Sequence, residues 1–151
     1  MSSFDERLAR CEGELKETYL GLYHDEKAYD YFVEMLRRCA DERPQELRDL
    51  DEQRLADPGW YTGNDMLGML MYVDCFAGTL QGVREKLGYI EECGVNYLHL
   101  MPLLESPEGR SDGGYAVSNF RKVQPELGTM DDLASLASEA TAATSRSAST
   151  S

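Results

Sequence analysis

The chain has 151 residues, about one domain's worth, and 42% of them are hydrophobic, which is enough for a packed core and too many for a wholly disordered chain. It has 28 acidic and 15 basic residues, a formal net charge of −13, which argues against nucleic acid and against an anionic membrane as partners. No apolar run reaches the roughly 18 residues that a membrane span needs, and the opening MSSFDERLAR has no apolar signal segment, so we expect a cytoplasmic protein.

The four cysteines, at positions 11, 39, 75 and 93, are too far apart in the sequence for a zinc knuckle or a CxxC redox pair. We expect reduced thiols, mostly buried, that pack as small hydrophobic residues. The sequence also shows no metal site, no Gly-rich phosphate loop and no nucleotide motif. No cofactor is therefore predicted.

The first part of the chain has the spacing of amphipathic helices. Apolar residues recur every three or four positions over Phe4–Leu22 and again over Tyr29–Cys39. A third, weaker helix follows Pro44, which suits a first helical turn because its missing amide hydrogen costs nothing there. We predict an N-terminal helical domain over residues 1–58.

The hydrophobic period then changes. Met66–Val73 is a nearly continuous apolar run, typical of a strand buried on both faces, and Val95–Met101 is a second such run. Between them, Thr79–Cys93 has helical spacing. A strand, a helix and a strand in this order predict a βαβ unit with parallel strands, in which His99 is a core histidine facing the strand interior.

A long connection follows the second strand, between Pro102 and Thr129, where the usual βα loop has about 2–6 residues. Loops of this length in compact domains are usually functional or disordered. The sequence Asp112-Gly113-Gly114-Tyr115 within it predicts a tight turn, because glycine adopts positive φ without strain.

The end of the chain has a different composition. Thr129 is expected to cap a helix whose first turn contains Asp131 and Asp132. Ala, Ser and Thr then fill most positions and the apolar stripe fades after Leu136. We predict a disordered tail over 138–151. Its composition is also typical of a premature end or of a read-through in a wrong frame.

Four segments of the second part carry a family resemblance: MYVDCFAGTL, LGYIEECGVNYLHLMPLL, SDGGYAVSNF and VQPELGTMDDL. Together they resemble the start of the catalytic domain of the α-amylase family of glycoside hydrolases, and within it the amylosucrases. The resemblance implies an α/β fold: an N-terminal helical unit followed, over 59–137, by the first βαβ part of a truncated (β/α)8 TIM barrel. In such barrels the active site lies at the C-terminal ends of the strands, where the long loop begins.

The resemblance also implies an activity: cleavage of sucrose with retention and transfer of glucose to an α-1,4-glucan. Asp112 matches the aspartate at the base of the glucose pocket, and Tyr115 matches the aromatic ring beneath the same sugar. No catalytic residue is carried over, because the family's nucleophile and acid/base follow later strands and have no counterpart here. We therefore expect the 151-residue chain to be inactive by itself.

Several interpretations stay open. A sucrose hydrolase or an α-glucosidase of the same family would share this part of the barrel. A non-catalytic helical interaction module is a further alternative, suggested by the amphipathic N-terminal helices. Without the resemblance, Asp112 would be an ordinary turn residue and Tyr115 a loop anchor. Asp74, just after the first strand, is interpreted as a structural turn residue.

Overall fold

A computed structural model describes residues 4–148 of the chain. The chain divides into two compact units, the first ending at Tyr61 and the second beginning at Thr62. The sequence placed this boundary slightly earlier, after residue 58. Each unit is described by itself below.

The first unit consists of helices, as the apolar spacing predicted. They are α1 (Phe4–Tyr23), α2 (Glu26–Asp41), α3 (Gln45–Ala56) and a short 3-10 turn, η1 (Trp60–Thr62), which begins at the end of this unit. α2 starts where the Asp25 carboxylate accepts a hydrogen bond from the amide of Ala28, one of the amides that a helix start leaves unpaired.

An aromatic cluster joins α1 to α2. The ring of Tyr19 stacks on Phe32 with centroids 5.3 Å apart and meets Tyr29 edge-on at 5.6 Å. Tyr29 is buried, and the exposed ion pair between Arg37 and Asp5, 2.7 Å long, connects the same two helices. Aromatic contacts therefore contribute to the packing of this helical pair.

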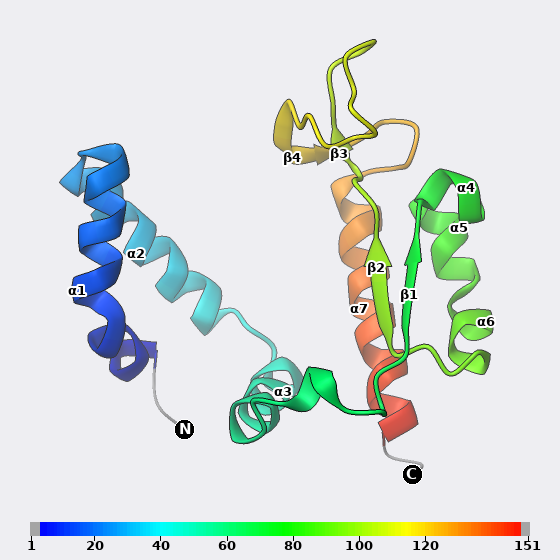
Figure 1. The fold of residues 1–151 in the computed structure, drawn as a ribbon, viewed down its shortest axis with the longest axis horizontal. Coiled ribbons are helices and arrows are strands. Elements are labelled where there is room, and N and C mark those ends of the chain that lie inside the picture. Colours follow the sequence, from blue (N-terminus) through cyan, green and yellow to red (C-terminus); the bar gives the residue numbers. More distant parts are fainter. Residues whose placement is uncertain (1–3, 149–151) are drawn as a thin grey trace. The chain divides into compact units, whose positions relative to one another are not determined.

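The second unit contains the predicted βαβ arrangement. β1 (Gly68–Met71) pairs in parallel with β2 (Tyr97–Leu100), in a register that runs from Gly68 opposite Tyr97 to Met71 opposite Leu100. Three short helices connect them: α4 (Val73–Ala77), α5 (Leu80–Glu85) and α6 (Leu87–Glu92). Figure 1 shows the two arrows side by side and pointing the same way, so the parallel pairing expected from the sequence is confirmed.

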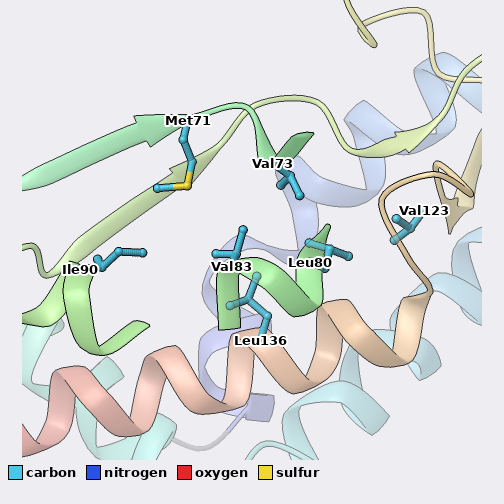
Figure 2. Packing of buried hydrophobic residues seen from close by; sticks show 7 residues of the cluster. All are labelled: Met71, Val73, Leu80, Val83, Ile90, Val123 and Leu136. Carbon is cyan, nitrogen blue, oxygen red and sulfur yellow. The ribbon is translucent and has the colours of Figure 1, made fainter. Parts of the chain in front are cut away.

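The core of this unit lies between the strand pair and the helices. Figure 2 shows its seven buried side chains, contributed by β1, the short connecting helices, β4 and α7 (Met130–Ala148): Met71, Val73, Leu80, Val83, Ile90, Val123 and Leu136. Leu80 and Val83 are fully buried. Both sit on α5, so this short helix is the centre of the packing.

The two strands are buried on one face only, which corrects the sequence prediction. Met69 and Leu98 pack against the core, whereas Leu70 points away from it and is 64% exposed. His99, the register partner of Leu70, is also exposed and is not a core histidine. An apolar run predicts burial on both faces, but within residues 62–148 the helices cover just one face of the pair.

The connecting helix predicted over Thr79–Cys93 forms as two helices. Thr79 caps α5 as expected, since its hydroxyl accepts a hydrogen bond from the amide of Gly82. The break falls at Lys86, whose ammonium group donates to the carbonyl of Phe76 and lies 4.8 Å from the centre of that ring. The glycines at 82 and 88, which weaken helices, flank the break.

The long connection after β2 contains a small sheet that the sequence pattern did not predict. β3 (Leu104–Glu105) pairs antiparallel with β4 (Asn119–Val123), with an irregular register between them. β3 is short and β4 shows no clean alternation of exposed and buried residues. Neither therefore leaves a period-2 signal in the sequence.

Helix α7 begins as predicted. The Thr129 hydroxyl accepts from the amide of Asp132, and the Asp132 carboxylate accepts from the amide and hydroxyl of Thr129. The hydrogen bonds that Thr129 donates lower the pKa of Asp132 below its ordinary value, and the bond from the hydroxyl has a larger effect than the bond from the amide. An ion pair between Glu139 and Arg84 links α7 to α5 and lowers the pKa of Glu139.

The end of the chain differs from the predicted disordered tail. α7 continues through residue 148, whereas the last three residues lie outside the described part. Alanine is the strongest helix former, so an Ala-rich segment extends a helix that is already nucleated even without an apolar stripe.

The predicted burial of the cysteines is also wrong. All four are free thiols and exposed. Cysteines at helical spacing were expected to lie on buried helix faces, but few side chains of the described residues are buried, and the cysteines are not among them.

Within the described residues, no helix is both long enough and apolar enough to cross a membrane.

Candidate functional site

The C-terminal ends of β1 and β2 meet at one edge of the second unit. The amide of Met101 donates to the carbonyl of Met71 over 2.8 Å, which extends the parallel pairing to the last residue of β1. Tyr72 follows β1, and Pro102 follows this extension of β2. Figure 1 shows both arrows pointing toward β3, β4 and the long loop, so the chain leaves this edge into the loop that the sequence marked as unusual.

The predicted Asp-Gly-Gly turn is present in this loop. The amide of Gly114 donates to the hydroxyl oxygen of Ser111 over 2.8 Å, and the amide of Tyr115 donates to the carbonyl of Asp112 over 3.1 Å. Gly113 and Gly114 have φ values of +60° and +88°. Such φ values are strained for other residues, which is the physical reason for two glycines here.

The turn rests on the ends of both strands. A Cβ atom added to Gly114 would lie 2.8 Å from the Cβ of Pro102, so the backbone of the turn is packed directly on Pro102, the second residue after β2. A Cβ atom added to Gly113 would lie 3.7 Å from the Tyr72 hydroxyl oxygen and 3.9 Å from a ring carbon of Tyr115. The turn is therefore close to residues that follow both strands, in addition to its own hydrogen bonds within the loop.

The two residues expected to contact a sugar lie on this one turn. Tyr115 is 64% exposed and Asp112 is exposed. Within residues 4–148 the carboxylate of Asp112 makes no hydrogen bond or ion pair. A flat ring and an unpaired carboxylate, presented together on a fixed turn, can bind a polyhydroxylated ligand: the ring takes an apolar face and the carboxylate accepts from hydroxyls.

Sequence reasoning gave no role to Tyr72. It fell inside the predicted strand Met66–Val73, which treated it as one more apolar residue. The available signal was its position, since it stands at the C-terminal end of a parallel strand, where loops build binding sites.

Asp74, two residues further on, lies exposed in α4, and its backbone carbonyl accepts a hydrogen bond from the amide of Gly78. The described residues contain no group of three or more side chains that could hold a metal ion.

Comparison with known families identifies this arrangement. Residues 37–144 match the family model described as "Alpha amylase, catalytic domain". The chain belongs to the α-amylase family. The match includes the whole βαβ unit, the long loop with its Asp-Gly-Gly turn and most of α7, so it covers the candidate site. The α/β fold class is thereby confirmed, with β1 and β2 as part of a TIM barrel.

Individual relatives are similar over shorter stretches. A trehalose synthase/amylase of Mycolicibacterium smegmatis is 49% identical over 59 residues, which is 39% of this chain and 10% of that protein. An oligo-1,6-glucosidase of a Bacillus strain is 40% identical over 62 residues, 41% of this chain and 12% of that protein. The chain thus spans about a tenth of the length of the curated relatives it matches.

Among solved structures, an isomaltulose synthase mutant of Erwinia rhapontici in complex with sucrose is 28% identical, with a TM-score of 0.46. The alignment covers 53% of this chain and 15% of that one. These relatives are a trehalose synthase/amylase, an oligo-1,6-glucosidase and an isomaltulose synthase, and the chain shares with them the α-amylase family. Family membership does not single out the amylosucrases among the members of the α-amylase family.

Proposed function

We propose that this chain forms the first part of the sugar-binding pocket of an enzyme that acts on α-glucosides, with Asp112 and Tyr115 as contacts to one glucosyl ring. The observation that supports this most directly is the position of the turn that carries both residues. It lies at the C-terminal ends of two parallel barrel strands, the edge at which TIM barrels bind their substrates.

The chemistry of the turn fits a pyranose ring. The Tyr115 ring can pack on the apolar C–H face of the sugar, while the Asp112 carboxylate accepts hydrogen bonds from the hydroxyl groups at its edge. Retaining enzymes then need two carboxyl groups about 5 Å apart. The resemblance assigns neither to this chain, so we expect the chain to bind a glucoside without hydrolysing it.

Within the family we propose an amylosucrase-like reaction, in which sucrose is the glucosyl donor and an α-1,4-glucan is the acceptor. Its support is the four-segment resemblance, from MYVDCFAGTL to VQPELGTMDDL. An α-glucosidase is the second candidate, favoured by the 40% identity to an oligo-1,6-glucosidase. For any longer polypeptide that includes this chain, the products decide: fructose and an elongated glucan support the first, whereas glucose from oligosaccharides, without fructose from sucrose, supports the second.

Sugar binding by the chain itself is tested by titration of the isotope-labelled protein with methyl α-glucoside, followed by NMR. We expect weak, saturable shifts at the amides of residues 111–115 and at the ring of Tyr115. Tyr115→Ala should abolish them, because the apolar platform is lost.

The matched control is Tyr89→Ala, which removes a tyrosine of similar exposure (57%) from α6, far along the chain from the turn. It should leave the shifts unchanged. If the unaltered chain shows no shifts at residues 111–115, or if Tyr115→Ala binds as well as the unaltered chain, the proposed sugar site is wrong.

A further inference from the structure

Tyr72 lies on the same side of the strand pair as the candidate site. Side chains alternate along a strand, so the buried Met71 points to the helices and Tyr72 points to the other face, together with the exposed Leu70. Tyr72 is 40% exposed and follows the last residue of β1. Its hydroxyl oxygen lies at the C-terminal edge, next to the Asp-Gly-Gly turn.

Two tyrosines converge above a single glycine of that turn. The Cβ position of Gly113 is 3.7 Å from the hydroxyl oxygen of Tyr72 and 3.9 Å from a ring carbon of Tyr115, an ordinary contact distance in both cases. A Cβ atom at Gly113 would thus be in van der Waals contact with both tyrosines. Asp112 is the neighbour of this glycine in the chain, so the Tyr72 hydroxyl lies beside the turn that carries both Asp112 and Tyr115.

Among the described residues, the Tyr72 hydroxyl has no hydrogen-bond partner. Within residues 4–148 it neither donates nor accepts a hydrogen bond, although its backbone carbonyl accepts from the amide of Phe76. A phenol hydroxyl is both a donor and an acceptor, the combination that a sugar hydroxyl matches. Tyr72 thus brings a hydroxyl without a partner among the described residues to within ordinary contact distance of the turn that carries Asp112 and Tyr115.

We propose that Tyr72 is a further sugar-binding residue, whose hydroxyl hydrogen-bonds a ring hydroxyl of the same glucosyl unit that Asp112 and Tyr115 hold. This inference rests on the proposed function and adds to it a contact from β1. The sugar would then be held between a flat ring, a carboxylate and a phenol hydroxyl, so that its orientation as well as its presence is recognised.

The test compares Tyr72→Phe with Tyr97→Phe in the 151-residue chain. Each substitution removes one hydroxyl from a tyrosine on the same face of the strand pair. Tyr97 is 44% exposed and is the first residue of β2, at the opposite end of the strands. NMR titration with methyl α-glucoside should show binding weakened roughly two- to tenfold by Tyr72→Phe, the effect of one neutral hydrogen bond, and unchanged by Tyr97→Phe.

Deoxy derivatives of the glucoside separate a direct contact from a structural effect. The deoxyglucoside that lacks the hydroxyl bound by Tyr72 should have equal affinity for the unaltered chain and for Tyr72→Phe. The other deoxyglucosides should still bind more weakly to Tyr72→Phe than to the unaltered chain. Two results would overturn the role of Tyr72 without contradicting the sugar site. One is equal affinity of both proteins for methyl α-glucoside, and the other is the same fall in affinity on Tyr72→Phe for every deoxy derivative. Absence of binding to the unaltered chain overturns both proposals.

Discussion

Gly114→Ala is expected to disrupt the turn that carries the candidate sugar contacts, for two separable reasons. The backbone there has φ of +88°, and a non-glycine residue held in a left-handed conformation costs about 1–2 kcal/mol. In addition, the new Cβ would lie 2.8 Å from the Cβ of Pro102, closer than side-chain atoms normally approach. Overpacking of this kind typically costs a further 1–3 kcal/mol, so we expect a total of roughly 2–5 kcal/mol.

Gly109→Ala provides the matched control. Gly109 lies in the same loop with φ of +66°, and a Cβ there would meet nothing within 4 Å. This variant therefore pays the conformational cost alone, about 1–2 kcal/mol. A larger loss in Gly114→Ala than in Gly109→Ala is the result expected from the additional contact with Pro102.

The assay is amide hydrogen exchange, because the loop can open without unfolding of the unit and the cost is then limited to local opening. The amide of Tyr115, which donates to the carbonyl of Asp112, should exchange faster in Gly114→Ala than in Gly109→Ala. Urea unfolding followed by circular dichroism measures any part of the cost that reaches the whole unit. Equal exchange at Tyr115 in the two variants would refute the argument that Pro102 positions the turn.

Two further predictions concern stability. Leu80→Ala removes a fully buried side chain from the core and should lower the free energy of unfolding in urea by about 2–5 kcal/mol. Leu70→Ala, at a position that is 64% exposed, should change it by less than about 0.5 kcal/mol. Similar losses in the two variants would contradict the assigned core. Asp132 has a pKa below its ordinary value of 3.8 because Thr129 donates to its carboxylate, so its contribution to stability is complete above 3.8 and is lost as the pH falls through the lowered pKa. In thermal melts over that acidic range, Asp132→Asn should therefore lose part of the pH dependence, and an unchanged pH profile would show that the cap does not contribute.

Local signals in the sequence were sufficient for the helices and for the parallel pair. The spacing of apolar residues predicted α1 and α2, and Thr79 and Thr129 marked the starts of α5 and α7. The Asp-Gly-Gly turn was predicted by its glycines alone. All of these depend on interactions within a few residues, which a single sequence displays directly.

Burial was predicted less well. Leu70 and His99 were assigned to a core but are exposed, and the four cysteines are exposed too. An apolar side chain in a strand is suited to burial, but whether it is buried depends on which other segments cover its face of the sheet. The small sheet of β3 and β4 left no local signal either, because β3 is short and β4 does not alternate between exposed and buried residues.

The sequence by itself thus determined the helical first unit, the βαβ element and the family, because periodicity and short motifs are local properties. Only the tertiary structure decided which face of the strands is covered, and that the turn with Asp112 and Tyr115 rests on Pro102 and beside Tyr72. Contacts between residues distant in the sequence arise from packing of whole elements, so no window of sequence contains them. The site is such a contact, since it exists only where two strand ends and one loop meet.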